Sequence, residues 1–274
     1  MKTVREPAVA GMFYPAFAPK LRSEIQAHLT SVNLKKTFEN IFGLVSPHAG
    51  YVYSGKTAAY AYKAIQNKSY KTVVVISPSH REYFPGISIY SGDAYKTPLG
   101  EIELDKEMIA KLTEDKIFIF EGINGHGAEH ALEVQLPFLQ TVLDGFKLVP
   151  IVMGDQRKEF VFHLAEKLSP LVNNETLIVA SSDLSHFHTR KEADKLDAVI
   201  ENRISSFDYN GLLDDLEKNK CESCGGGPIA VLLRTAELNG IQNVKILSRT
   251  DSGDVSGDTN EVVGYLSAVL FSSS

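Results

Sequence analysis

The chain has 274 residues, 43% of them hydrophobic and 23% charged, which is the balance of an ordinary globular protein and excludes a disordered or membrane-embedded chain. The formal net charge of -6 provides no broad basic field for a phosphate backbone, so we expect no nucleic-acid partner. The longest apolar runs are strand-sized, shorter than the ~20 residues that cross a bilayer, and the first residues lack the apolar core of a secretion signal, which predicts a cytoplasmic protein without a membrane partner.

Helix-like and strand-like segments alternate along the first part of the chain. Apolar residues spaced four apart predict a helix over residues 21–30. A buried strand at 41–46, a helix at 54–66 and a β-branched strand at 71–77 together predict one β-α-β unit.

The middle of the chain is expected to contain an inserted hairpin. Residues 87–90 and 100–104 form its two strands, separated by a turn that contains Pro98, and a helix begins at Asp105. Residues 129–143 are expected to be helical, with an internal proline that starts a new turn or kinks the helix.

The rest of the chain continues the alternation. Strands are expected at 147–153 and 176–181, with a helix at 156–168 between them. Helices and then closing strands follow, namely helices at 191–204, 209–218 and 228–238 and strands at 244–249 and 262–271. No linker or change of composition divides the chain, so we expect one doubly wound α/β domain over residues 1–274.

Two short runs of the same build place a histidine just past the end of a predicted strand. They are Val-Ser-Pro-His-Ala-Gly at 45–50, with His48, and Val-Ile-Ser-Pro-Ser-His at 75–80, with His80. In an α/β protein the loops at the carboxyl ends of the strands form the ligand site. We therefore expect the two imidazoles to face one cleft.

Two further segments place histidines after a predicted strand or before a predicted helix. The run Ser-Ser-Asp-Leu-Ser-His at 181–186 follows a predicted strand, and Gly-His-Gly-Ala-Glu-His at 125–130 precedes a predicted helix. The other histidines, His28, His163 and His188, are expected to be structural. The loop histidines are thus the candidates for chemistry.

A third ligand would complete a metal site. Imidazole suits borderline divalent metals, and two histidines with one anionic ligand leave positions open for water, substrate or dioxygen. Cys224 precedes three glycines at a predicted helix N-terminus, where free backbone N–H groups favour a thiolate. Glu222 is the carboxylate alternative, and the residues by themselves leave the choice open.

Other catalytic motifs are incomplete. The glycines after Cys224 lack the P-loop pattern, and Ser181 and Ser182 near His186 lack the G-x-S-x-G elbow of serine hydrolases. The C-x-x-C pair Cys221 and Cys224 has no second Cys or His pair nearby to complete a structural zinc site.

Several segments in order resemble the Memo family, which is called AmmeMemoRadiSam system protein B in prokaryotes. They are residues 8–15, 46–55, 77–80, 129–137, 181–186 and 252–254, and the resemblance runs from about residue 4 to 270. It implies the fold of class III extradiol ring-cleaving dioxygenases, a single three-layer domain with a mostly parallel central sheet flanked by helices.

The resemblance also implies roles for individual residues. Those dioxygenases hold non-haem iron(II) with two histidines and a glutamate. By this likeness His48 and His80 are metal ligands, His186 takes the place of the catalytic base, and His130 is a second active-site histidine. Asp183 would orient His186.

The Memo family differs from the dioxygenases at the third ligand position. The resemblance implies a cysteine there in place of the glutamate, and in this chain it is Cys224. A thiolate favours iron, copper(I) or zinc and changes the reduction potential, so ring cleavage does not follow. We expect a divalent metal, iron(II) first with copper or zinc as alternatives, in a metal-dependent redox enzyme that acts on a small molecule.

Two other functions stay open at this stage. One is a non-enzymatic module that uses the cleft to bind a peptide or partner protein, as eukaryotic Memo relatives are thought to do with phosphotyrosine peptides. The other is a zinc-dependent hydrolase, in which His186 or His130 acts as the base. The prokaryotic family name also suggests a radical SAM protein and an AMMECR-type protein as partners.

Overall fold

The computed structural model describes residues 2–114 and 116–272. In chain order the elements are β1 (Val4–Arg5), α1 (Ala18–Ser31), β2 (Ile41–Ser46), α2 (Tyr51–Ala64), β3 (Thr72–Pro78), β4 (Ile87–Tyr90), β5 (Ala94–Thr97), β6 (Gly100–Glu103), α3 (Lys106–Leu112), β7 (Ile119–Gly122), the 3-10 helix η1 (Glu133–Gln135), α4 (Leu136–Val142), β8 (Lys147–Met153), α5 (Lys158–Leu168), β9 (Thr176–Ser181), β10 (His186–His188), α6 (Arg190–Ser205), α7 (Tyr209–Glu217), α8 (Gly226–Leu238), β11 (Asn243–Asp251), α9 (Gly253–Ser256) and β12 (Val262–Phe271). None of the helices in the described ranges is both long and apolar enough to span a bilayer.

Most strands belong to one large sheet. Its order is β10-β12-β2-β9-β3-β8-β4-β7, with β11 paired to β12. The central strands β2, β9, β3 and β8 are parallel to one another, whereas β12 runs antiparallel to β2 and β4 runs antiparallel to β8. Because the central strands point the same way, their carboxyl ends meet at one edge of the sheet, as in other ligand-binding α/β folds.

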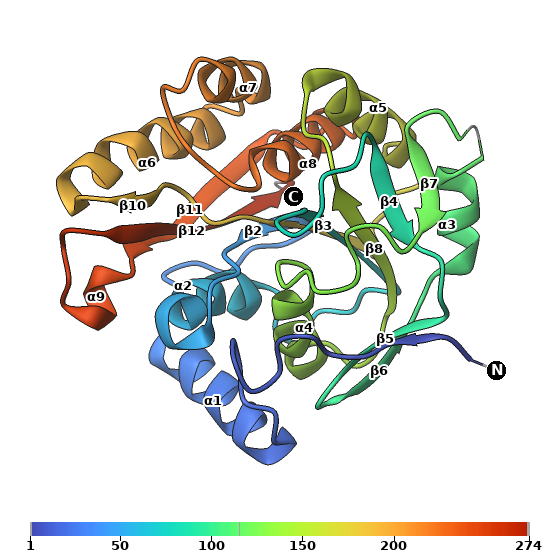
Figure 1. Ribbon diagram of the computed structural model, residues 1–274, viewed down its shortest axis with the longest axis horizontal. Coiled ribbons are helices and arrows are strands. Elements are labelled where there is room, and N and C mark those ends of the chain that lie inside the picture. The colour runs from blue at the N-terminus through green and yellow to red at the C-terminus, as the bar shows by residue number, and fades with distance from the viewer. Residues whose placement is uncertain (1, 115, 273–274) are drawn as a thin grey trace.

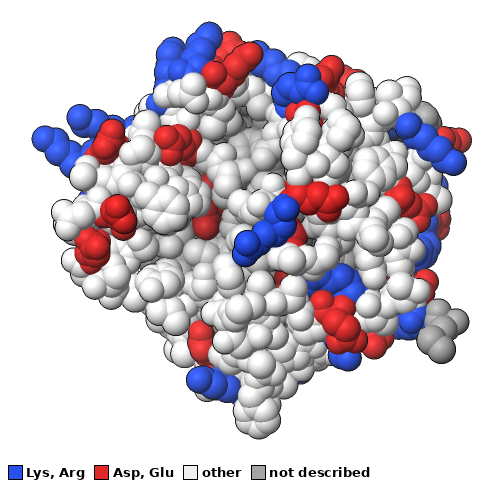
Figure 2. Space-filling model, in the orientation of Figure 1, with Lys and Arg blue, Asp and Glu red and all other residues white. Residues whose placement is uncertain are grey.

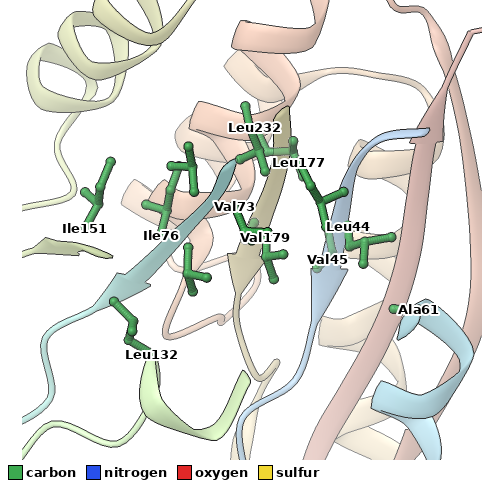
Figure 3. Close-up of a cluster of buried hydrophobic side chains, with 14 of the residues drawn as sticks. Leu44, Val45, Ala61, Val73, Ile76, Leu132, Ile151, Leu177, Val179 and Leu232 are labelled. Atoms are coloured by element: carbon green, nitrogen blue, oxygen red, sulfur yellow. The ribbon is translucent and has the colours of Figure 1, made fainter. Parts of the chain in front are cut away.

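Helices cover both faces of this sheet. Figure 1 shows α1, α2 and α4 on one side and α5, α7 and α8 on the other. The central strands are apolar along their whole length because neither face meets water: Val73–Ile76 in β3 are 0% exposed. In Figure 3, Leu44, Val179 and Leu232 belong to the buried cluster that joins β2, β9 and α8. The predicted fold class, an α/β structure with a mostly parallel sheet between helical layers, is confirmed.

A glycine brings α8 close to the sheet. A Cβ added at Gly43 in β2 would lie 2.4 Å from Leu232 Cδ1 and 2.8 Å from the carbonyl oxygen of Ile178. The absence of a side chain at this position therefore lets α8 pack directly on β2. The same helix begins beside Cys224, so this packing helps to place the cysteine at the carboxyl edge of the sheet.

The expected hairpin of residues 87–90 and 100–104 is wrong. Strand β4 instead lies in the large sheet between β8 and β7. Strand β6 pairs with β5, and Thr97 lies opposite Gly100, so the hairpin turns at Pro98 and Leu99. The prediction missed β5 because its four residues contain only a short apolar pattern.

The expected helix at 129–143 begins later than predicted. Glu129 accepts the backbone N–H groups of His130 and Ala131, both over 2.9 Å, and this local bonding competes with helix formation. Helical structure therefore starts at η1, and Pro137 lies in the first turn of α4, where its missing N–H costs nothing. The other predicted helices and long strands agree with the structure to within three residues at each end.

A buried ion pair joins the N-terminal segment to the rest of the molecule. The Arg5 guanidinium pairs with the Glu133 carboxylate, and their side chains are 5% and 0% exposed. Arg5 also donates to the carbonyl oxygens of His126, Gly127 and Glu129. The segment before α1 thereby holds the loop that carries Glu129 and His130.

We expect Arg5→Met to destabilise the protein by about 3–5 kcal/mol, because it leaves the Glu133 carboxylate buried without its cation. Urea unfolding followed by circular dichroism measures the change. Lys2→Met is the matched control, since its pairs with Glu101 and Glu103 are exposed and should contribute nothing measurable. Equal stability of the two variants would contradict the role given to Arg5.

Candidate metal centre

Three side chains that are distant in sequence meet at the carboxyl edge of the sheet. His48 follows β2, His80 follows β3, and Cys224 precedes α8. One ligand atom from each lies within 4.8 Å of the others. His48 Nε2 is 3.2 Å from Cys224 Sγ, and the ring centroids of His48 and His80 are 5.2 Å apart. The structure thus brings together the three residues for which the sequence predicted metal ligation.

Glu129 orients His80. Its Oε1 lies 2.9 Å from His80 Nδ1, and its Oε2 accepts the backbone N–H of the same residue. Burial acts to raise the pKa of Glu129, but the hydrogen bond and charge of His80 and the backbone N–H groups lower it to about 2. A carboxylate requires Nδ1 to donate, so in the neutral imidazole Nε2 of His80 carries the lone pair. Such carboxylate–histidine pairs orient metal-bound imidazoles in many proteins.

Glu129 and His130 also form a second group with His80 whose ligand atoms lie within 4.8 Å of one another. The Glu129 Oε1 atom, however, already accepts from His80 Nδ1 and from the backbone N–H groups of His130 and Ala131. Its lone pairs are therefore engaged, and an ion would have to displace these donors. In this structure the Glu129 carboxylate therefore orients His80.

The Cys224 loop is held by hydrogen bonds on both sides. Gln156 Nε2 donates to the Cys224 carbonyl oxygen and Gln156 Oε1 accepts from Gly227 N–H, each over 2.8 Å. The backbone N–H of Asp183 points at Cys224 Sγ over 3.3 Å. Burial raises the pKa of the Cys224 thiol, so a thiolate there needs a cation beside it.

Glu222, the alternative third ligand, points elsewhere. Its Oε2 lies 2.8 Å from His188 Nε2, and both side chains reach solvent. Its side chain is 45% exposed, whereas His48 is buried. The residue that faces His48 is Cys224, so the candidate donor set is two imidazoles and a sulfur.

Asp183 has a different place from the one expected. We expected it to orient His186, but its Oδ1 accepts the backbone N–H of His48 over 2.8 Å. Burial raises the pKa of Asp183 to about 7, partly offset by backbone N–H groups of His48 and Ala49. Asp183 therefore holds the loop that carries His48, and its own backbone N–H contacts Cys224.

His186 lies outside the three-residue cluster but lines a cleft with Cys224. This cleft has a volume of about 770 Å³ and opens between α5, α7 and the Cys224 loop. Figure 2 shows the hollow on this face of the molecule. Burial lowers the pKa of His186, so its imidazole is neutral at pH 7 and can accept a proton from a molecule in the cleft.

His130 packs against both histidines of the cluster. Its ring stacks on His80 with centroids 4.8 Å apart and lies 4.6 Å from the ring of Phe13, which belongs to the N-terminal segment. Burial lowers the pKa of His130 to about 4, so it too is neutral at pH 7. The N-terminal segment thus forms one wall beside the histidines.

His126, which the sequence predicted to be a loop histidine available for chemistry, is structural. The Tyr95 hydroxyl lies 2.5 Å from its Nδ1, and its Nε2 lies 3.3 Å from the Ser88 carbonyl oxygen. Because a carbonyl only accepts, Nε2 carries the hydrogen and Nδ1 accepts from Tyr95. Burial lowers the pKa of His126 to about 3.

Sequence reasoning missed the orienting roles of Glu129, Ser181 and Gln135. Ser181 Oγ lies 2.9 Å from His48 Nδ1, and Gln135 Nε2 donates to Ser181 Oγ over 2.7 Å. The available signal was the position of Ser181 at a strand end beside the expected site. Glu129 and Gln135 lie in a segment that was expected to be helical, which gave no reason to place them next to His80 or His48.

Known proteins match this chain over nearly its whole length. The family model described as Memo-like protein matches residues 5–269. A MEMO1 family protein of Thermoplasma volcanium is 36% identical over 269 residues, which cover 97% of this chain and 98% of that protein. A MEMO1 family protein of Methanosarcina barkeri is 37% identical over 271 residues, covering 97% of this chain and 100% of that protein.

A solved structure shares the fold. The crystal structure of an uncharacterized protein from Escherichia coli K12 superposes with a TM-score of 0.58, covering 84% of this chain and 99% of that one. Its sequence identity is 13%, so the likeness concerns the fold alone.

We expect the metal-free protein to lose stability as the pH falls below about 6.5. His126 binds a proton near pH 6.5 when unfolded but only near pH 3 when folded, so between these values unfolding takes up a proton. Each such histidine contributes a slope of about 1.4 kcal/mol per pH unit. Urea unfolding between pH 5 and 6.5 should give a smaller slope for His126→Phe than for the unchanged protein.

The control is His188→Gln. A glutamate partner raises the pKa of His188, so its removal should leave the slope equal or slightly steeper. A His126→Phe slope equal to that of the unchanged protein would show that the buried imidazole does not resist protonation.

Proposed function

This chain belongs to the Memo-like protein family, and we propose that it binds one transition-metal ion through His48 Nε2, His80 Nε2 and Cys224 Sγ. The observation that supports this most directly is that one ligand atom from each of the three residues lies within 4.8 Å of the others. Both imidazoles have a partner at Nδ1, Ser181 for His48 and Glu129 for His80. Each ring therefore presents its other nitrogen to a common point, which fits a bound ion.

The electrostatics of the cluster also suit a cation. Burial lowers the pKa of His48 and raises the pKa of Cys224, so without an ion both groups are neutral. A neutral imidazole is ready to ligate, and a buried thiolate becomes favourable only beside a positive charge. The site is thus arranged so that ion binding and thiol deprotonation occur together.

We propose iron(II) as the native ion, with copper(I) and zinc as the alternatives that the same donors accept. Two imidazoles and one thiolate combine borderline and soft ligands, a set that disfavours magnesium and calcium. Such an ion would supply Lewis-acid or one-electron chemistry to a molecule that reaches it.

We propose that this molecule is small and enters through the cleft beside Cys224. Leu213 and Leu216 provide an apolar wall. The cations in the wall are already paired, Arg157 with Asp155 and Lys158 with Asp214, so the described residues of the wall offer no free positive charge. His186 in the same wall is placed to take a proton from the bound molecule, which makes it the proposed base.

The first test is metal content. Protein purified without oxygen should contain about one iron per chain, and His48→Ala and Cys224→Ser should lose it, as measured by elemental analysis. Cys221→Ser is the matched control, because Cys221 is buried in the hydrophobic core and is not part of the cluster.

Three outcomes separate the candidate functions. Iron with a thiolate charge-transfer band supports the redox proposal, whereas stoichiometric zinc would replace it with a hydrolase. Unchanged metal content in both ligand variants, with peptide binding that chelators do not affect, would favour a non-enzymatic binding module.

The second test is proton release. Binding of Zn²⁺ to the metal-free protein at pH 7 should release about one proton per ion, because the Cys224 thiol must ionise while His48 is already neutral. Affinity should consequently rise with pH. Calorimetry in buffers of different ionisation enthalpy counts the protons, and Cys224→Ser should release none. Proton release that persists in this variant would exclude Cys224 as the ligand that ionises.

A further inference from the structure

We propose that Ser181, Gln135 and Tyr62 are positioning residues that hold His48 in the tautomer with its hydrogen on Nδ1, which leaves Nε2 free for a metal ion. The inference rests on the proposed metal site and concerns side chains behind the ligand. Each hydrogen bond between these four residues has a direction, and the directions together determine the tautomer.

The neighbouring carbonyl oxygen of Pro47 identifies which terminal atom of the Gln135 amide is the nitrogen. One of its terminal atoms lies 3.0 Å from the carbonyl oxygen of Pro47, which can only accept, so this atom is the nitrogen Nε2. The other atom is Oε1, and the Tyr62 hydroxyl donates to it over 2.5 Å. Both ends of the amide are thereby assigned.

The Ser181 hydroxyl lies between three partners. Gln135 Nε2 donates a hydrogen to Ser181 Oγ over 2.7 Å. Ser181 has one hydrogen to give, and the Ala131 carbonyl oxygen, 2.7 Å away, can only receive it. With that hydrogen assigned, Ser181 Oγ can act toward His48 only as an acceptor.

His48 must therefore donate to Ser181. Its Nδ1 lies 2.9 Å from Ser181 Oγ, so the hydrogen is on Nδ1. In a neutral imidazole the other nitrogen then carries a lone pair, and Nε2 faces Cys224 Sγ over 3.2 Å. The opposite tautomer would place two acceptors, Nδ1 and Ser181 Oγ, against each other.

Burial of these side chains limits alternative hydrogen-bonding arrangements. Tyr62 and Ser181 are 0% exposed, and Gln135 and His48 are 1% exposed, so bulk water does not supply alternative donors or acceptors. The residues come from α2, η1, β9 and the loop after β2, so their hydrogen bonds link four parts of the fold to one imidazole. A substitution of any of the three positioning residues should therefore alter whether His48 Nε2 carries a hydrogen or a lone pair.

Long-range ¹H–¹⁵N NMR of the metal-free protein tests this, because it distinguishes the two imidazole tautomers. We expect His48 to carry its hydrogen on Nδ1 in the unchanged protein. Ser181→Ala should populate the opposite tautomer and weaken Co²⁺ binding by about tenfold or more. Ser181→Thr retains a hydroxyl and should restore the original tautomer.

Ser77→Ala is the matched control. Ser77 is also buried near the end of a central strand, β3, and its Oγ has no hydrogen-bond partner within the described residues. Ser77→Ala also removes one buried serine hydroxyl, but this hydroxyl makes no hydrogen bond to His48. Neither the tautomer nor the Co²⁺ affinity should change.

The outcomes decide between the two proposals. The opposite tautomer in the unchanged protein overturns the inference, whether or not the variants fold, and so does a Ser181→Ala protein with unchanged tautomer and affinity. Because the tautomer is measured without metal, an expected NMR result together with no Co²⁺ binding would support the positioning role and contradict only the proposed metal function.

Discussion

The parallel register of β2, β9 and β3 is the constraint on which the candidate site depends. Ser46 lies beside Ser181, and Val74 lies beside Ile178, so the three strands end at the same level. Each strand then passes into a polar loop, which brings His48, Asp183 and His80 to one edge although more than 130 residues separate the first from the second. The apolar strands below supply the rigidity that a preorganised site requires.

Placing so many polar groups at a buried edge is costly unless each finds partners. Glu129 accepts three hydrogen bonds at one oxygen, and Asp183 accepts from the His48 loop. In the segment that carries Glu129, Arg5 pairs with the Glu133 carboxylate and donates a hydrogen bond to the Glu129 carbonyl oxygen. The N-terminal residues therefore belong to the site as much as the strand-end loops do, because without them this segment would leave buried polar groups unpaired.

A cysteine in place of a carboxylate would change the chemistry of the proposed metal site. Either ligand would bring one negative charge to a divalent ion, so the net charge of the proposed metal site would be the same. The thiolate is softer and more electron-donating, which shifts metal preference and reduction potential without changing the fold. This separation between fold and chemistry is the reason that the likeness to a solved structure at 13% identity carries the architecture and not the reaction.

The sequence alone determined the α/β class, the long central strands and the loops that bear His48 and His80, because fully buried parallel strands have an unbroken apolar pattern and end in polar residues. It left the third ligand open between Cys224 and Glu222, and only the tertiary structure placed the sulfur beside His48 and turned Glu222 toward His188. The partner of β6 and the role of Glu129 were also decided in three dimensions. Short strands and single polar residues carry no periodicity, so their partners depend on which distant segments the packing brings alongside them.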